Sequence, residues 1–140
     1  MKKRQFIATA LSLACLSMAA SAQAQAIKIA GLYELSGAGA SAGTNFKNGV
    51  ELAVKEINAA GGILGKKIEH SIADTQSNPG VAKGLTTKAV DDGVLAIFGP
   101  VFSGSIMVSM AESRRAEVPN IVGGEAAAIT KQGNPYIFRT

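Results

Sequence analysis

The stretch "IKIAGLYELSGAGASAGTNFKNG", Ile27–Gly49, decides the fold. It starts as an apolar run, continues through a turn that holds Gly37, Gly39 and Gly43, and passes into a segment with apolar residues at helical spacing. A strand, a glycine-rich turn and a helix in this order open many dinucleotide-binding sites. The stretch therefore raises two hypotheses, a phosphate cradle or a loop with another purpose.

The same alternation of strand and helix continues along the chain. Strands are expected at 27–35, 67–74, 94–99, 119–122 and 135–138, with helices between them and a short turn or helix at 126–130. The run "VLAIFG" at 94–99 is typical of a strand buried on both faces of a parallel sheet. This order predicts an α/β fold, a parallel sheet with helices on both faces.

Ligands of such folds bind in the loops that follow the carboxyl ends of the strands. These loops are expected at 36–44, 75–79, 99–103 and 123–126. A dinucleotide site is disfavoured, because the glycines follow GxGxxxG rather than GxGxxG and Asp74 lies too far beyond Gly37 to hold a ribose. No glycine-lysine-serine/threonine follows the turn, which excludes a Walker loop.

Residues 1–24 are predicted to be a secretory signal peptide. A cationic "MKKR" precedes an apolar run of about 15 residues and the small-residue pattern "SAQAQA", with cleavage expected after Ala24 or, alternatively, Ala26. The run is shorter than the roughly 20 residues that span a bilayer. Cys15 lies inside it without the preceding leucine of a lipoprotein signal. The mature chain, residues 25–140, is thus expected to be exported and to lack cysteine.

Loss of the signal also removes three cations, Lys2, Lys3 and Arg4. The 14 basic residues fall to 11, against 10 acidic ones. We find no basic patch with interleaved aromatic residues, so no nucleic-acid partner is expected. One histidine and no mature cysteine cannot build a zinc site, and no metal or cofactor is expected.

Several segments together resemble one family. They are "IKIAGLYELSGAGASAG", "GVELAVKEINAAGGILGKKIE", "DTQSNPGVA", "VDDGVLAIFGPVFSGS" and "GNPYIFRT". Over Ile27–Thr140 the chain is similar to periplasmic solute-binding proteins of branched-chain amino acid ABC transporters, the leucine/isoleucine/valine type. The resemblance implies a type I periplasmic-binding-protein fold, of which residues 25–140 form an incomplete first lobe. The second lobe is expected outside this sequence.

The resemblance also implies a function without catalysis. Two lobes close over a small polar ligand, often an amino acid, in the periplasm, and the closed form docks on the membrane permease. Two other classes stay open, a ligand-sensing extracellular domain of a receptor and an exported α/β enzyme. The enzyme would need a nucleophile and a base, yet His70 and Asp74 lie about 13 Å apart on one strand.

Residues near the strand ends are the candidate ligand contacts. A helix amino terminus supplies N–H groups for a carboxylate, and Ser103 is expected at such a terminus, as a helix cap, a ligand donor or both. The resemblance implies ligand contact by Ser103, and Ser105, further along the same helix, is a second candidate. Phe102 either walls the pocket or belongs to the core. Tyr33 and Glu34, at the end of the first strand, are each candidates to project into the cleft.

The loop at Gly124, Glu125 and Ala126 matches the place where the family holds the amino and carboxylate groups of the ligand. This loop departs from the family pattern, because it lacks the usual threonine and carries Glu125. The Glu125 carboxylate either pairs with a ligand ammonium group or is a solvated loop charge. The departure places leucine-like specificity in doubt.

Overall fold

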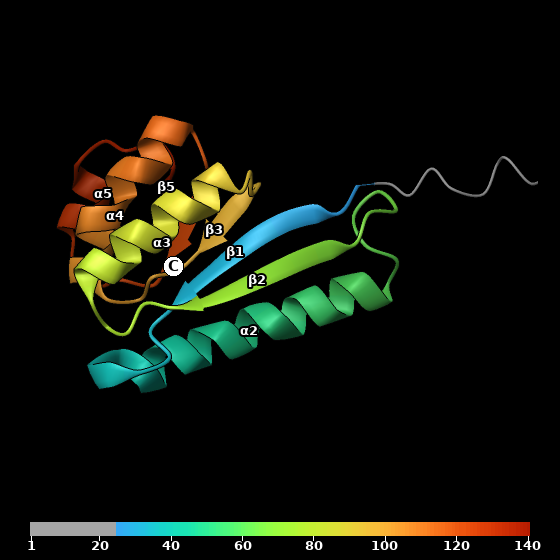
Figure 1. Cartoon of the computed structure of the whole chain (residues 1–140), viewed down its shortest axis with the longest axis horizontal. Coiled ribbons are helices and arrows are strands. Elements are labelled where there is room, and N and C mark those ends of the chain that lie inside the picture. The colour runs from blue at the N-terminus through green and yellow to red at the C-terminus, as the bar shows by residue number, and fades with distance from the viewer. Residues whose placement is uncertain (1–24) are drawn as a thin grey trace, which may run out of the picture.

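A parallel sheet of five strands forms the centre of the computed structural model, which describes residues 25–140 (Figure 1). The strands are β1 (Ile27–Tyr33), β2 (Ile68–Asp74), β3 (Ala96–Phe98), β4 (Asn120–Val122) and β5 (Ile137–Arg139). Their order is β2-β1-β3-β4-β5, and every neighbouring pair is parallel. The expected strands are confirmed, with shifted ends. The predicted signal peptide and Cys15 lie outside the described residues.

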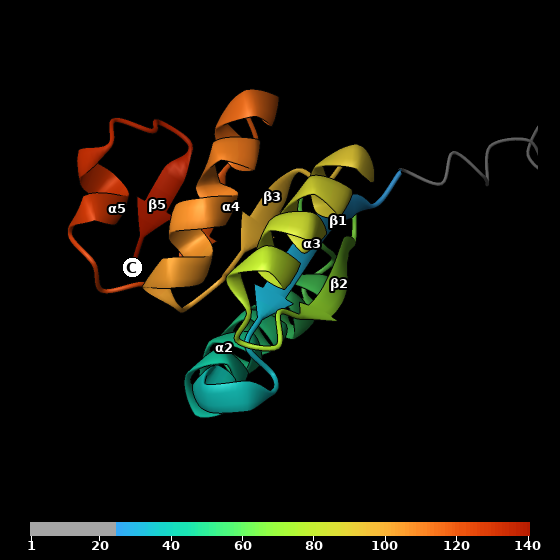
Figure 2. The ribbon, with the colours of Figure 1, turned by 60° about the vertical axis from the view of Figure 1, so that its left-hand side comes forward.

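Helices cover both faces of this sheet, as predicted. They are η1 (Gly37–Gly39), α2 (Ala40–Ala59), α3 (Pro79–Asp91), α4 (Ser103–Ala116) and α5 (Ala128–Lys131). Across the sheet, the connection from β1 to β2 runs in one direction, and the connections from β2 to β3 and from β3 to β4 run in the opposite direction. Because such crossovers are right-handed, α2 lies on one face of the sheet and α3 and α4 lie on the other. Figures 1 and 2 show this division.

The strand order therefore reverses at β1. The loop after β1 leads to one face of the sheet and the loop after β3 leads to the other, so the two loops part at the carboxyl edge. This divergence is the topological switch point at which open α/β sheets bind their ligands.

The core lies mainly on the α3 and α4 face. One cluster joins β1, β3 and α3, and a second joins α4, β4, α5 and β5; their buried members are Ala30, Leu32, Ala89, Val94 and Ile97, and Ile106, Met110, Val122, Ile129 and Ile137. Thr86 on α3 and Ser109 on α4 are buried, and their hydroxyls donate to carbonyls of their own helix. These bonds satisfy the hydroxyls where the two helices pack.

The α2 face is covered less completely. Gly43 is the buried residue of α2, whereas Leu52 is 57% exposed. In β3, Ile97 is buried, whereas Ala96 and Phe98, whose side chains point to the opposite face, are only half-buried. The prediction that 94–99 is buried on both faces is therefore wrong for the described residues, because α2 extends over β1 and β2 but not over β3 (Figure 1).

One glycine sets how closely α2 approaches the sheet. A Cβ added to Gly43 would lie 2.1 Å from the carbonyl oxygen of Glu34, well inside van der Waals contact. The first turn of α2 thus rests directly on the backbone at the end of β1. Any side chain at this position would push the helix away from the candidate loops.

We expect Gly43→Ala to lower the free energy of unfolding by about 1–3 kcal/mol, because the added methyl forces backbone apart. Gly49→Ala is the matched control in the same helix, since a Cβ there meets no atom within 4 Å. It should leave stability unchanged or raise it by about 0.5–1 kcal/mol. Urea unfolding followed by circular dichroism measures both. Equal effects would contradict the close approach.

Candidate functional site

A pocket of about 240 Å³ opens at the switch point. Three segments line it: the start of α2, the loop after β3 with the first residue of α4, and the loop after β4. The lining residues are Ala42, Val101, Phe102, Ser103, Gly123 and Glu125. Phe102, Ser103 and Glu125 are candidate residues from the sequence, and the fold brings them together here. Ala42, Val101 and Gly123 were not singled out as contacts, but they lie in the loops 36–44, 99–103 and 123–126 that were expected to bind a ligand.

The amino terminus of α4 reaches this pocket through Ser103. The helix starts at Ser103 with Phe102 as its N-cap residue, and no side chain caps it. By contrast, Asn78 Oδ1 caps α3 by accepting from two amides of its first turn. The amides of the first turn of α4, Ser103 to Ser105, thus lack a side-chain acceptor among the described residues, and the positive end of the helix dipole is free for an anion.

Ser103 is not the helix cap that the sequence suggested. The helix already starts at Ser103, so the N-cap position falls on Phe102. The Ser103 Oγ instead accepts a hydrogen bond from the amide of Ala126 at 3.1 Å. This bond ties α4 to the loop after β4, and the Ser103 hydroxyl keeps its own proton to donate. Ala126 contributes through its backbone.

Gly124 makes this tie between α4 and the loop after β4 feasible. A Cβ there would lie 2.3 Å from Ile106 Cδ1 and 3.2 Å from Ser103 Oγ. The loop is therefore pressed against α4, where a larger residue does not fit.

A buried carboxylate lies behind the pocket wall. Glu34 is 0% exposed; its Oε2 accepts from the amide of Val101 at 2.9 Å, and its Oε1 accepts from the amide of Phe102 at 3.2 Å. The hypothesis that Glu34 projects into the cleft is wrong in this structure, since its side chain is enclosed. It fixes the backbone directly before α4 instead.

Tyr33 does not join the site either. Its side chain is fully buried, with its ring centroid 6.0 Å from that of Phe46 on α2 and its hydroxyl 3.1 Å from His70 Nε2. Burial raises the pKa of the Tyr33 hydroxyl and lowers the pKa of His70. Adjacent strand residues point to opposite faces, so Tyr33 faces α2 while Glu34 faces the loop before α4.

The remaining candidates take different positions. Ser105 is 1% exposed, and its Oγ has no hydrogen-bond partner among the described residues, so it lies behind the pocket rather than in its lining. Phe102 is half-buried, with its ring against the backbone of Gly39. Glu125 is exposed at the rim, and its carbonyl oxygen accepts from Arg139 Nη1 at 2.9 Å.

The glycine-rich loop is not a phosphate cradle. The amides of Leu35 and Ser36 donate to Asp74 Oδ1 at 2.9 and 3.2 Å, and the amide of Gly39 donates to Ser77 Oγ at 2.9 Å. Donors already engaged in this way are unavailable to a phosphate. The loop after β2 thus organises the loop after β1, a role for Asp74 and Ser77 that the sequence did not reveal.

No catalytic triad forms around the histidine. His70 contacts the Tyr33 hydroxyl, whereas the Asp74 carboxylate accepts from Ser36, Leu35 and Gln76. Within residues 25–140, no cluster of histidine, cysteine or acidic side chains is arranged to hold a metal ion. No helix in that range is long and apolar enough to cross a bilayer.

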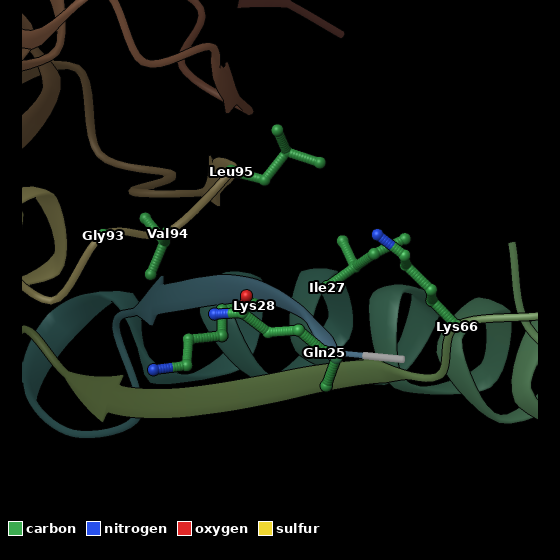
Figure 3. Close-up of a pocket in the computed structure, with 8 residues that line it drawn as sticks. Gln25, Ile27, Lys28, Lys66, Gly93, Val94 and Leu95 are labelled. Carbon is green, nitrogen blue, oxygen red and sulfur yellow. The ribbon is translucent and has the colours of Figure 1, made fainter. Parts of the chain in front are cut away.

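A larger pocket, of about 420 Å³, lies at the opposite edge of the sheet (Figure 3). Its lining is Gln25, Ala26, Ile27, Lys28, Lys66, Gly93, Val94 and Leu95. It adjoins the amino ends of β1 and β3, where α3 ends rather than begins. We favour the smaller pocket as the candidate functional site, because an uncapped helix amino terminus, a hydroxyl and a carboxylate meet there.

The fold defines a class of protein, an α/β domain with a parallel sheet and a candidate binding pocket at its switch point. Residues 26–140 match the family model described as periplasmic binding protein, and the chain belongs to this family. This confirms the resemblance found in the sequence and its fold.

Several curated relatives are named as Leu/Ile/Val-binding proteins or their homologues. The chain is 36% identical over 141 residues to Leu/Ile/Val-binding protein homolog 8 of Brucella suis, covering 98% of this chain and 34% of the relative. It is also 36% identical to Leu/Ile/Val-binding protein BraC3 of Rhizobium johnstonii, covering 94% and 36%. The chain thus spans about a third of the length of these curated relatives.

Solved structures of solute-binding proteins are also similar to this chain. The branched-chain amino acid transporter substrate-binding protein LivJ of Streptococcus pneumoniae, in complex with isoleucine, is 40% identical with a TM-score of 0.79, covering 82% of this chain and 33% of that one. A solute-binding protein of an ABC transporter from Rhodopseudomonas palustris, in complex with 3,4-dihydroxy benzoic acid, is 28% identical with a TM-score of 0.74, covering 81% and 31%.

Asp74→Asn tests the role of Asp74 in holding the loop. The Ser36 hydroxyl, followed by backbone amides, keeps the pKa of Asp74 below its usual value. A depressed folded-state pKa adds stability above the unfolded pKa of about 4, and this stability disappears as the pH falls through the lower folded pKa. We expect the variant to be less stable at pH 7 and to converge with the original chain in acid.

Thermal unfolding between pH 7 and pH 2.5 measures this convergence. Asp91→Asn is the control, because Asp91 is an exposed carboxylate at the end of α3. A stability difference for Asp74→Asn that stays constant with pH would contradict the role given to the ionised carboxylate.

Proposed function

We propose that this chain is the first lobe of the substrate-binding component of an ABC transporter. It captures an amino acid or a similar small polar solute in the periplasm and delivers it to the membrane permease. The names of the relatives and structural neighbours support this class. The observation that carries the proposal is the uncapped amino terminus of α4, which opens with the Ser103 hydroxyl onto the switch-point pocket.

Each group in the pocket has a task in this proposal. The first-turn amides of α4 and the Ser103 hydroxyl donate to the ligand carboxylate. Val101 and Phe102 supply an apolar wall for the ligand body. Glu125 at the rim accepts from the ligand ammonium group. A carboxylate is common to the isoleucine and the 3,4-dihydroxy benzoic acid in the two neighbouring structures, so we place carboxylate recognition first.

The proposal is of a binding protein and not an enzyme. The pocket lining offers one hydroxyl and one carboxylate, and Ser103 Oγ has the Ala126 amide as its partner rather than a base. Non-covalent capture needs only donors, an acceptor and an apolar wall. No observation in the fold favours the receptor-sensor or exported-enzyme alternatives over transport.

Titration with leucine, followed by amide NMR shifts of the isotope-labelled chain, tests this function. We expect the largest shifts at the amides of Ser103, Gly104 and Ser105. Ser103→Ala should weaken binding about tenfold or more, since a hydrogen bond to a charged group contributes about 1.5–3 kcal/mol. Ser71→Ala, which removes an exposed hydroxyl on β2, is the control and should leave affinity unchanged.

Two results would overturn the assignment. One is the absence of shifts at α4 with leucine, amides and aromatic acids alike. The other is an equal loss of affinity in the Ser103 and Ser71 variants, which would show that the Ser103 hydroxyl does not contact the solute.

A further inference from the structure

We infer that Glu34 is a positioning residue whose buried charge makes the pocket select zwitterions over net anions. The inference rests on the proposed function, because it concerns the ligand carboxylate at α4. It goes beyond that function by assigning a specificity role to a residue that does not touch the solute.

The geometry of Glu34 gives the first step. Both carboxylate oxygens accept backbone amides, at 2.9 Å from Val101 and 3.2 Å from Phe102. An ionised carboxylate suits this arrangement, because it accepts at both oxygens and donates at neither. These are the last two amides before α4 begins. With them engaged, only the first-turn amides from Ser103 onward are left for a ligand.

The distance to the ligand follows from chain geometry. Successive backbone nitrogens are no more than about 3.6 Å apart, so Glu34 Oε1 lies within about 7 Å of the Ser103 amide. A ligand carboxylate bound there comes within about 10 Å of a charge that is fully enclosed in protein. Two negative charges at this separation repel by an amount worth about 4- to 16-fold in affinity at an effective dielectric constant of about 20–40.

The other charges of the pocket do not cancel this repulsion. The lining contains Glu125 and no lysine or arginine. The Arg139 guanidinium lies nearby, against the carbonyl oxygen of Glu125, but it is exposed and solvent screens it. A carboxylate ligand that brings its own positive charge is therefore favoured over a net anion of the same shape. A zwitterion meets this condition, and a simple acid does not.

A purely structural Glu34 would behave differently. If it only held the loop before α4, its replacement would weaken every ligand by a similar factor, because the same amides and hydroxyl would be displaced for all. A charge role instead changes the ratio of affinities between a zwitterion and an anion of the same shape. This ratio is the diagnostic quantity.

Leucine and 4-methylpentanoate, which is leucine without its ammonium group, are the matched probes. We expect the original chain to bind leucine more tightly than 4-methylpentanoate, and Glu34→Gln to reduce this ratio of affinities by about 4- to 16-fold. Glu56→Gln, which removes an exposed carboxylate on α2, is the control and should leave the ratio unchanged. NMR titration gives the affinities, and the amide spectrum shows whether each variant is folded.

A second variant, Glu125→Gln, tests the inference if Glu34→Gln does not fold. In Glu125→Gln no acidic side chain remains among the residues that line the pocket, while Glu34 stays behind its wall. This variant should still bind leucine more tightly than 4-methylpentanoate, because the Glu34 charge still disfavours the net anion. The reverse order, or an unchanged leucine ratio in a folded Glu34→Gln variant, overturns the inference. In either case leucine binding at α4 would still support the proposed function, whereas absence of all binding would sink that function itself.

Discussion

Two hydrogen bonds from the backbone of Val101 and Phe102 to the Glu34 carboxylate join the two loops that diverge at the switch point. Burial of a carboxylate is costly unless its oxygens are satisfied, so the loop after β3 must stay where it supplies both amides. That requirement sets the position at which α4 begins. The free amino terminus of α4 and the pocket beside it both depend on this link.

Other loops are held to the same edge by similar means. Asp74 and Ser77 bind the backbone of the loop after β1, and Ser103 binds the loop after β4 through the amide of Ala126. Gly43 and Gly124 allow the close contacts that these bonds require. An edge fixed in this way presents its donors before a ligand arrives, which lowers the entropic cost of binding.

The chain has the fold of its family, but the residues at the carboxyl edge of its sheet are its own. Its sheet, its switch point and its relatives place it among the periplasmic binding proteins. Glu34 and Glu125, one enclosed and one at the rim, give the edge an acidic character. An acidic edge around a helix dipole suits a solute that carries both charges.

The sequence by itself determined the α/β order, the parallel sheet and the loops that form the site, because strand and helix periodicity is a local property. It also indicated Phe102, Ser103 and Glu125, from their places after predicted strands together with the family resemblance. Only the tertiary structure decided that Tyr33 packs under α2 while Glu34 holds the loop before α4. Neighbouring strand residues face opposite sides, and what covers each side depends on the direction of the crossovers. The uncapped start of α4 likewise arises from contacts between loops distant in sequence.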